Sequence, residues 1–276
     1  MHGWNVAAPA LGAGLLWAGQ PWPALGLLGS AHAAWLAATV WPNARWSGRV
    51  LGHRGVTAAA SPDQRADHTA PPPRLWLTID DGPCRADHQA LLNLLDQAGV
   101  RVSAFVIGHR AAADPALVDE WHAAGHRLEN HTWSHRSAST WCAGPGRARD
   151  EIDRCQDWLA GRTGRSPCWF RAPAGLANPW LHAAAERRGL ATLAWTARGL
   201  DGIASNPAQV ARRIRRRWHP GGIVLIHQGL RGGRQGSAAP EVLRRVLETA
   251  REDGYEWMTP DQGLRLLGLG EPGPPQ

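Results

Sequence analysis

Two adjacent carboxylates, Asp80 and Asp81, follow the apolar run 75–79 and stand directly before a Gly-Pro turn. Two neighbouring acids repel each other, so their joint ionisation at neutral pH requires a cation or an arginine nearby. Farther along the chain, His131 and His135 stand four residues apart, a spacing that can place both imidazoles on one side of a helical turn. Two imidazoles and one carboxylate make a three-ligand metal site with room for water.

Other polar residues occur at or just beyond the ends of further apolar runs: Arg171 after Trp169-Phe170, Asp201 after the run that begins near Leu193, and His227 after Leu225-Ile226. Taken singly, each signal is weak, since a His-x-x-x-His pair is more often two surface histidines and a histidine on an apolar strand is usually a core residue. Their occurrence together, each at a strand end, is the strong signal.

The elements that must position these residues alternate regularly. The sequence predicts short strands at residues 75–80, 102–107, 126–130, 168–171, 191–196, 222–227 and 255–259, with amphipathic helices between them. Glycines 99, 125, 189 and 254 stand where helices would end. About seven such βα units predict an α/β fold with a parallel sheet closed into a barrel, whose site forms at the carboxyl ends of the strands.

The length of the chain, 276 residues, fits one α/β domain with an appendage. All 30 basic residues are arginine and the formal net charge is +7, which favours acidic surfaces or polymers as partners. The run from Arg212 to Trp218 resembles a nucleic-acid patch, but its helical pattern favours the solvated face of an amphipathic helix. We therefore expect no nucleic-acid partner.

Four cysteines, Cys84, Cys142, Cys155 and Cys168, lack Cys-x-x-Cys spacing and are too few for a disulfide scaffold. Cys84 lies beside the acidic pair, and we interpret it as an adjacent thiol rather than a metal ligand.

The N-terminal segment, residues 1–44, contains no charged side chain, and its two apolar runs, roughly 6–18 and 22–41, flank a Gln-Pro-Trp-Pro break. We expect a membrane-associated helical hairpin here, because the second run is long enough to span a bilayer. A signal peptide with a small-x-small site at Ala31-His32-Ala33 is the main rival, although no positively charged region precedes it. A buried helical pair in a soluble protein is the third interpretation.

In this interpretation, residues 45–73 form a basic, Pro- and Ala-rich linker. Residues 74–268 form the catalytic domain, and residues 269–276 form a disordered tail. Arg45, Arg49 and Arg54 follow the second apolar run and favour the cytoplasmic side for that flank. The expected function favours the opposite orientation, a membrane-anchored catalytic domain on the extracytoplasmic side. The sequence therefore supports both orientations.

The motifs in this order resemble the polysaccharide deacetylase family, the NodB-homology domain of carbohydrate esterase family 4, over residues 74–268. The resemblance lies in five segments: Thr78-Ile79-Asp80-Asp81-Gly82-Pro83, His131-Thr132-Trp133-Ser134-His135, Arg171-Ala172-Pro173-Ala174-Gly175, Asp201, and Leu225-Ile226-His227. The fold of this family is a distorted (β/α) barrel, which agrees with the alternation of strands and helices.

The resemblance implies a role for each residue of the metal site and its base. Asp80 is expected to be the general base, and Asp81, His131 and His135 the metal ligands. Arg171 is expected to brace the base. The ligand set suits Zn²⁺, although Co²⁺, Mn²⁺, Fe²⁺ and Ni²⁺ accept the same donors.

The resemblance also implies roles on the substrate side. His227, oriented by Asp201, is expected to be the general acid. The backbone N–H of Ala174 is expected to donate to the oxyanion, and Leu225 to line a small pocket for the acetyl methyl group.

Two departures from the family pattern concern substrate contacts. The third motif usually carries a tyrosine where Ala174 stands, and the fourth a tryptophan where Gly202 stands. The fourth motif also has Arg198 where an acidic residue is common. The groove therefore lacks its usual aromatic walls, and Trp133 and Trp141 are candidates to bind sugar instead.

These residues predict a metal-dependent deacetylase that removes N-acetyl, or less favourably O-acetyl, groups from peptidoglycan, a chitin-like oligomer or a glycolipid. One alternative is a small-molecule amidohydrolase with a C–N substrate in the cytoplasm. Another is a non-catalytic, membrane-bound carbohydrate-binding protein, which the complete set of acid, base and ligand residues disfavours.

Overall fold

The computed structural model describes residues 13, 17–18, 21–40, 50–51, 71–201, 206–229 and 238–267. The strands in these residues are β1 Val50–Leu51, β2 Arg74–Gly82, β3 Ser103–Val106, β4 Arg127–Asn130, β5 Trp169–Phe170, β6 Ala191–Leu193, β7 Ala197–Arg198, β8 Gly222–His227 and β9 Glu256–Trp257. The helices are α2 Pro21–Val40, α3 His88–Gln97, α4 Gly108–Ala113, α5 Pro115–Ala123, α6 Ser137–Thr140, α7 Pro145–Thr163, α8 Pro179–Arg187, α9 Pro207–Arg215, α10 Ala239–Glu252 and α11 Pro260–Leu266, with a short 3-10 turn, η2, at Pro173–Gly175.

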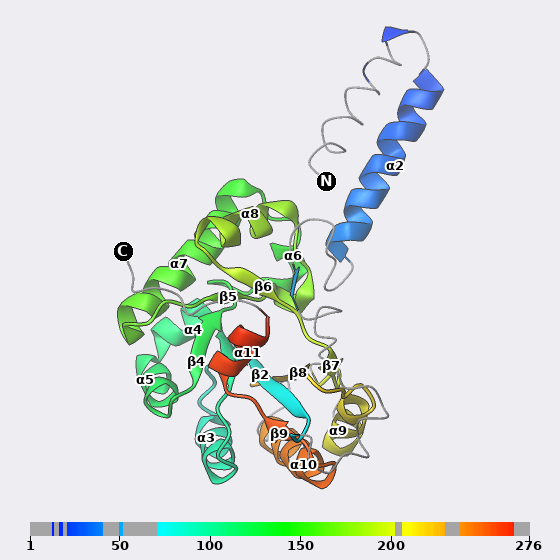
Figure 1. Cartoon of the computed structure of the whole chain (residues 1–276). Coiled ribbons are helices and arrows are strands. Elements are labelled where there is room, and N and C mark those ends of the chain that lie inside the picture. The colour runs from blue at the N-terminus through cyan, green and yellow to red at the C-terminus, as the bar shows by residue number, and fades with distance from the viewer. Residues whose placement is uncertain are drawn as a thin grey trace.

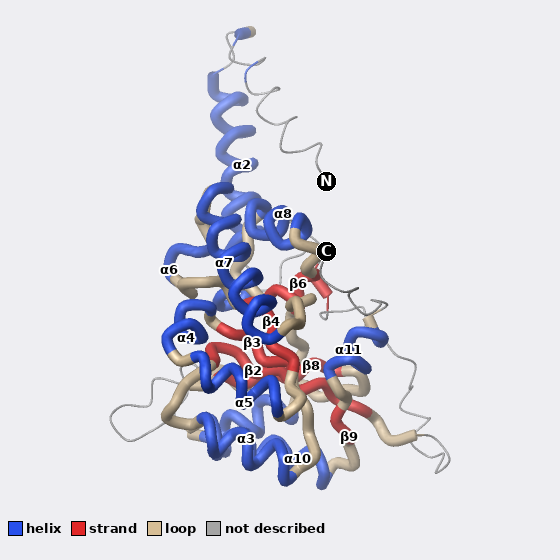
Figure 2. The backbone as a smooth tube through the Cα atoms, turned by 90° about the vertical axis from the view of Figure 1, so that its left-hand side faces the viewer, coloured by secondary structure: helices blue, strands red, loops and turns tan. Residues whose placement is uncertain are grey.

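The nine described strands form one parallel sheet in the order β1-β6-β5-β4-β3-β2-β8-β7, with β9 paired to the start of β2. Strands and helices alternate along most of the chain, and the helices from α3 onward surround the sheet (Figures 1 and 2). The seven strands predicted from the sequence are confirmed as β2 to β6, β8 and β9. The predicted α/β class and distorted (β/α) barrel are confirmed as well.

The barrel is open between β1 and β7, the first and last strands of the order, which no ladder joins within the described part of the chain. Residues 194–196 cross this gap and bind the strands on either side: the N–H of Ala194 donates to Leu51 O at 2.8 Å, and that of Thr196 donates to Ile223 O at 2.9 Å. The ladder between β5 and β6 ends at the pair Phe170 and Thr192, and the carbonyls of residues 193 and 194, which lie beyond it, accept hydrogen bonds from a side chain inside the barrel.

Side chains alternate between the two faces of the strands, as β2 illustrates. Its odd-numbered residues from 75 to 79 are fully buried leucines and an isoleucine that pack outward against the helices. The even-numbered Trp76, Thr78 and Asp80 share the opposite face, which is the interior of the barrel. The alternation therefore holds the helices in place and, at the same time, carries a carboxylate to the interior at the end of the strand.

The helix α9 confirms the interpretation of the basic run. Val210, Ala211 and Ile214 are buried against the sheet, whereas the arginines from residue 212 to residue 217 are exposed. Arg215 forms a two-bond ion pair with Asp253 after α10. The basic residues are thus the solvated face of an amphipathic helix.

The helix α11 covers the end of the barrel where the strands begin. Gly263 lies against the ring of Trp76 so closely that a Cβ atom would come within 2.5 Å of it, so only glycine fits here. Asp261 forms an ion pair with Arg127, the first residue of β4, at 3.1 Å. The end where the strands finish is left for the site.

The prediction of a membrane-spanning hairpin at residues 1–44 is not supported. Helix α2 has 20 residues, but none of the described helices is long and apolar enough to cross a membrane. Most of the first apolar run, most of the predicted linker 45–73 and the predicted tail 269–276 lie outside the described residues.

All four cysteines are free thiols, as the sequence predicts for a chain without a disulfide scaffold. Cys155 and Cys168 are buried, and burial raises the pKa of Cys155 to about 12. These two thiols therefore behave as small core residues.

A buried histidine predicts a pH-dependent stability. His182 on α8 is 2% exposed, and among the described residues its Nε2 atom has no hydrogen-bond partner. Burial lowers its pKa from 6.5 to about 4. The unfolded chain therefore takes up the proton first as pH falls, so this contribution to stability is complete above pH 6.5 and is lost toward pH 4. We expect this histidine alone to lower the unfolding free energy by about 2 kcal/mol between pH 7 and pH 5.

Urea unfolding of His182→Gln across this pH range tests the effect, with His122→Gln, at an exposed position of α5, as the matched control. The His182→Gln profile should be flatter than those of the wild type and the control. The same pH slope in all three proteins would contradict the assignment.

Candidate metal centre and active site

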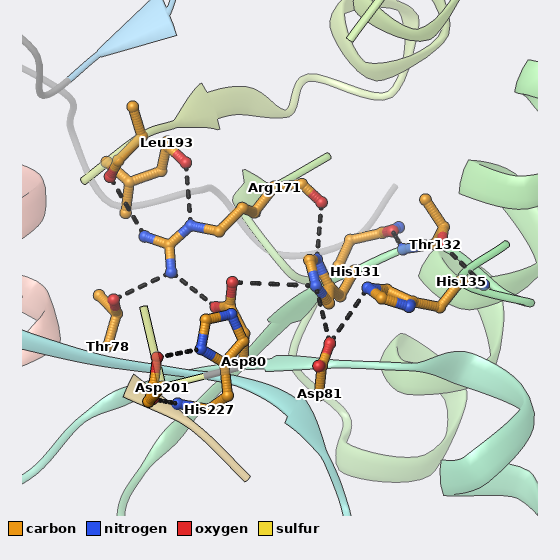
Figure 3. A network of polar contacts seen from close by, with 12 residues as sticks. Thr78, Asp80, Asp81, His131, Thr132, His135, Arg171, Leu193, Asp201 and His227 are labelled. Atoms are coloured by element: carbon orange, nitrogen blue, oxygen red, sulfur yellow. Dashed lines mark hydrogen bonds and ion pairs between the residues drawn. The ribbon is translucent and has the colours of Figure 1, made fainter. Parts of the chain in front are cut away.

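Seven of the residues predicted to do chemistry gather at the end of the barrel where the strands finish (Figure 3). Asp80 and Asp81 close β2, His227 is the last residue of β8, and Arg171 directly follows β5. His131 and His135 follow β4, and Asp201 lies three residues after β7. Since all pairings are parallel, these strand ends lie at one edge of the sheet. The sequence had predicted this gathering.

Asp81, His131 and His135 form a cluster whose ligand atoms all lie within 4.8 Å of one another. The Oδ1 atom of Asp81 lies 3.3 Å from Nε2 of His131 and 3.1 Å from Nε2 of His135. Within the described residues this is the one group of three or more His, Cys, Asp or Glu side chains with such spacing.

The hydrogen bonds around this cluster test whether a metal ion fits it. Nδ1 of His131 lies 2.8 Å from the carbonyl oxygen of Arg171, which can only accept, so Nδ1 carries the proton. In the neutral imidazole, Nε2 then presents a lone pair toward Oδ1 of Asp81, a buried atom that accepts no hydrogen bond from any described residue. Two lone pairs that face each other repel, and a cation between them removes the repulsion. The donor set therefore fits a divalent metal ion.

The protonation of His135 and Asp81 agrees with that fit. Burial and the nearby His131 lower the pKa of His135 to about 3, so this imidazole is neutral at pH 7 and available as a ligand. Burial alone would raise the pKa of Asp81, but His131, His135 and His227 outweigh it and lower the pKa well below its usual value. The cluster thus offers two imidazole nitrogens and one anionic oxygen, which suit zinc and several other transition metals.

The backbone at Asp81 explains how two adjacent carboxylates reach the same site. The register of β2 against β3 slips between Asp80 and Gly82, so Asp81 is the extra residue of a β-bulge. Its φ is +68°, in the left-handed region. In a regular strand its side chain would point away from that of Asp80, and the bulge turns it back to the metal cluster.

Left-handed backbone is concentrated at this site. Among the described residues, the non-glycine residues with positive φ are Asp81, Thr132, His135, Ala174 and Leu200, and each lies in or beside a segment that carries a predicted motif. Such conformations cost on the order of 1 kcal/mol or more each and persist where the surroundings hold them. Hydrogen bonds do so here, for example from Arg110 Nη1 to Asp81 O at 2.7 Å and from His135 N to Thr132 Oγ1 at 3.1 Å.

Asp80 is held apart from the metal cluster by Arg171. Nη1 of Arg171 donates to Oδ1 of Asp80 at 2.6 Å and to Oγ1 of Thr78 at 2.9 Å, and both members of the ion pair are buried. The other carboxylate oxygen of Asp80 lies 3.8 Å from Nε2 of His131. This oxygen therefore faces the metal cluster without being one of its ligand atoms.

Arg171 also binds the irregular edge of the barrel. Its Nε donates to Leu193 O at 3.1 Å and its Nη2 to Ala194 O at 3.2 Å, while its guanidinium lies 4.0 Å from the centre of the Phe105 ring. Burial lowers the pKa of this guanidinium, and Asp80 opposes that effect.

His227 and Asp201 form a second pair beside the first. Oδ1 of Asp201 lies 2.8 Å from Nδ1 of His227, and Oδ2 accepts the backbone N–H of the same histidine at 2.7 Å. Burial disfavours the charged imidazole, but the hydrogen bond and charge of Asp201, with the charges of Asp80 and Asp81, raise the pKa of His227 to about 9. The histidine is therefore protonated at neutral pH, with Nε2 as its free ring nitrogen.

Three of the predicted substrate residues, Ala174, Leu225 and Trp133, have different surroundings. Ala174 lies in η2 with φ of +55°, next to Arg171, and Leu225 is buried on the inner face of β8 two residues before His227. Trp133 packs over Gly108, where a Cβ would come within 2.5 Å of its ring, and Arg154 lies 4.4 Å from the ring centre. The role of Trp133 in sugar binding stays a prediction, and these contacts already occupy much of its ring.

Sequence reasoning missed the residues that support the metal-binding loop. Glu151 on α7 accepts hydrogen bonds from the N–H and the hydroxyl of Ser134, and Asn130 accepts the N–H of Thr132 at 3.0 Å. Asn130 is fixed in turn by its donation to Ile152 O at 2.9 Å. No local pattern marks Glu151, because its link to the loop arises only when α7 packs beside β4.

Sequence reasoning also missed the support of the loop after β8. Asp87, which is buried before α3, accepts hydrogen bonds from Gln228 Nε2 and Gly229 N, both at 2.9 Å. The N–H of Gln228 donates to Asp80 O at 2.8 Å. The position of Gln228 directly after His227 was the one signal available in the sequence.

Comparison with known proteins places this geometry in a family context. The model of the polysaccharide deacetylase family matches residues 67–193. The chain is 28% identical over 194 residues to a peptidoglycan-N-acetylglucosamine deacetylase of Bacillus cereus, with 68% of this chain and 87% of the relative covered. It is 31% identical over 179 residues to a chitooligosaccharide deacetylase of a Bradyrhizobium species, with 62% of this chain and 77% of the relative covered.

The fold recurs in solved structures. Peptidoglycan deacetylase PdaC from Bacillus subtilis has a TM-score of 0.62 at 22% identity, with 71% of this chain and 91% of the other covered. A family 4 carbohydrate esterase pseudoenzyme from Bacillus anthracis has the same TM-score at 22% identity, with 70% and 66% covered. Because a pseudoenzyme shares the fold, the argument for activity must come from the residues of the site.

The cluster predicts stoichiometric metal binding that depends on Asp81. Removal of the anionic ligand in Asp81→Ala should weaken Zn²⁺ binding by at least about 100-fold, since even changes to outer-shell partners cost ten- to 100-fold. Calorimetric titration of the metal-free chain measures this affinity. Asp96→Ala, an exposed carboxylate on α3 with one long ion pair to Arg101, is the matched control. Wild-type affinity in Asp81→Ala would contradict the assignment.

Proposed function

Since this chain belongs to the polysaccharide deacetylase family, we propose that it is a metal-dependent hydrolase that removes N-acetyl groups from an amino-sugar polymer. The observation that carries the proposal is the position of Asp80. Its carboxylate is held by Arg171 beside the Asp81, His131 and His135 cluster, and is not one of the ligands. Such an arrangement separates a base from a metal site and leaves both in reach of one substrate carbonyl.

An amide is a poor electrophile and water is a weak nucleophile, so this reaction requires activation of both the amide carbonyl and the water molecule. When bound, a divalent ion supplies polarisation of the amide carbonyl and lowers the pKa of an adjacent water molecule. Asp81, His131 and His135 are the residues that we propose to hold it, and zinc is our first choice among the metals that accept two imidazoles and a carboxylate.

Asp80 is the proposed general base. The oxygen that faces His131 is free of Arg171, so it can accept the proton of the attacking water. Arg171 is a positioning residue in this proposal, because it fixes the other oxygen of Asp80 and, through its own carbonyl, fixes the ring of His131.

His227 is the proposed general acid. The leaving amine departs slowly unless it is protonated, and the protonated imidazole can deliver its Nε2 proton while Asp201 holds Nδ1. The N–H of Ala174 is the proposed donor to the oxyanion, and Leu225 contributes apolar surface beneath the acetyl methyl group.

The proposed substrates are the glycan of peptidoglycan and chitin-like oligomers, because the relatives of known name are deacetylases of these two classes. We place the reaction with peptidoglycan outside the cytoplasm and retain the charge-free residues 1–44 as the proposed membrane attachment. A topology reporter fused after Gln276 tests the side, and a cytoplasmic signal would exclude the cell-wall polymer.

The function predicts acetate release by the full chain from N-acetylglucosamine oligomers or peptidoglycan, dependent on added Zn²⁺ or Co²⁺ and abolished by a chelator. Asp80→Asn should keep the wild-type metal affinity and lose about 100-fold or more in kcat, as expected for loss of a general base. Asp114→Asn, a carboxylate outside the described site that pairs with Arg85, is the control. Activity that survives both chelation and Asp80→Asn would overturn the mechanism.

The pair of His227 and Asp201 predicts a shift in the pH profile. A general acid must be protonated, so kcat falls as pH rises through the pKa of His227. Asp201→Asn removes the charge that raises this pKa, and the alkaline limb should move down by about one pH unit or more. The kcat profile from pH 5 to pH 10 measures the limb, with Asp253→Asn as a control in an exposed ion pair. An unchanged alkaline limb would rule out His227 as the acid.

A further inference from the structure

Arg198, the last residue of β7, points to the inside of the barrel. Its neighbour Ala197 is fully buried in the outer core with Val210 and Ile214 of α9, so the side chain of Arg198 lies on the opposite face. In the ladder Arg198 pairs with Leu225, which belongs to the inner cluster and precedes His227 by two residues. Arg198 therefore shares the inner face with the proposed acid.

The guanidinium of Arg198 rests against Trp195, a residue that also contacts the catalytic loops. The Cζ atom of Arg198 lies 5.3 Å from the centre of the Trp195 ring, and that of Arg171 lies 5.7 Å from it. The same ring packs so closely on Gly175, which follows Ala174, that a Cβ there would come within 2.5 Å. Arg198 is thus connected to the proposed oxyanion site through a single aromatic ring.

No carboxylate of the described site forms an ion pair with Arg198. Asp80 is paired with Arg171, and both oxygens of Asp201 are taken by His227. Arg198 forms no hydrogen bond or ion pair with any residue in the described ranges, although it is half-buried. Burial and the charge of Arg217 lower its pKa, and the opposing charge of Asp201 does not offset them.

A half-buried cation without a partner costs free energy, and stacking on Trp195 recovers only part of that cost. A guanidinium has five N–H donors in a planar fork that matches carboxylate and phosphate oxygens. We infer that Arg198 binds an anionic group, a carboxylate or a phosphate, carried by the acetylated sugar that enters this site. The inference rests on the proposed function and specifies its substrate: an acidic glycan is preferred to a neutral one.

The experiment compares kcat/KM of the full chain on three substrates: a neutral N-acetylglucosamine oligomer, a glycan in which alternate sugars carry a lactyl carboxylate, and N-acetylglucosamine 6-phosphate. Arg198→Gln should raise KM and lower kcat/KM by about tenfold or more on an anionic substrate, in line with loss of a charge-assisted hydrogen bond. Its kcat/KM on the neutral oligomer should change by no more than about twofold. Whichever anionic substrate shows the loss identifies the group as carboxylate or phosphate.

Two further variants distinguish direct contact between Arg198 and the anionic group from a general effect of positive charge. Arg212→Gln removes the same charge from the exposed side of α9 and should leave all three substrates unchanged. Arg198→Lys keeps the charge without the planar fork and should restore part of the loss. Equal losses on neutral and anionic substrates, or no loss on either anionic substrate, would overturn the inference.

Measurements of saccharide affinity distinguish failure of this inference from failure of the proposed function. Calorimetry with the three saccharides, performed on Asp80→Asn with and without Arg198→Gln, measures affinity without turnover. If the wild type releases no acetate but Arg198→Gln still weakens binding of an anionic saccharide, the proposed function fails and the inference stands. If acetate is released but affinity for both anionic saccharides is independent of Arg198, the inference fails and the function stands.

Discussion

The buried ion pair between Arg171 and Asp80 is the interaction on which the rest of the site depends. Two charges taken out of water are tolerated only when their remaining donors and acceptors are also satisfied. The structure meets this condition, since Arg171 also donates to Thr78 and to two backbone carbonyls and stacks on Phe105. A base that carries out proton transfer at neutral pH must be anionic, and this network holds the charge of Asp80 in the barrel interior.

The same arginine joins the chemistry to the backbone at the end of the ladder between β5 and β6. Its guanidinium binds the carbonyls of residues 193 and 194, which lie beyond the last pair of that ladder, Phe170 and Thr192, and its own carbonyl orients the ring of His131. The end of this ladder therefore leaves backbone acceptors for a side chain that also fixes the base and a ligand.

Most of the fold and the contacts among the motifs could be predicted because both arise from local patterns. Apolar runs marked the strands, and parallel pairing brought their polar ends together. The two-residue strands β1 and β7 were missed, since two residues carry no periodicity. Glu151 and Asp87 were missed because their roles arise from packing between distant segments.

The contrast between Asp80 and Asp81 follows from one extra residue in β2. Without the bulge, alternation would send one carboxylate to the barrel interior and the other into the helical layer, where a charge has no partner. With Asp81 at φ of +68°, both reach the site, but from different backbone positions. The carboxylate of Asp80 meets Arg171 inside the barrel, and that of Asp81 meets the two imidazoles at its rim. Identical side chains thus acquire different chemistry from backbone geometry alone, which no pattern of residue types encodes.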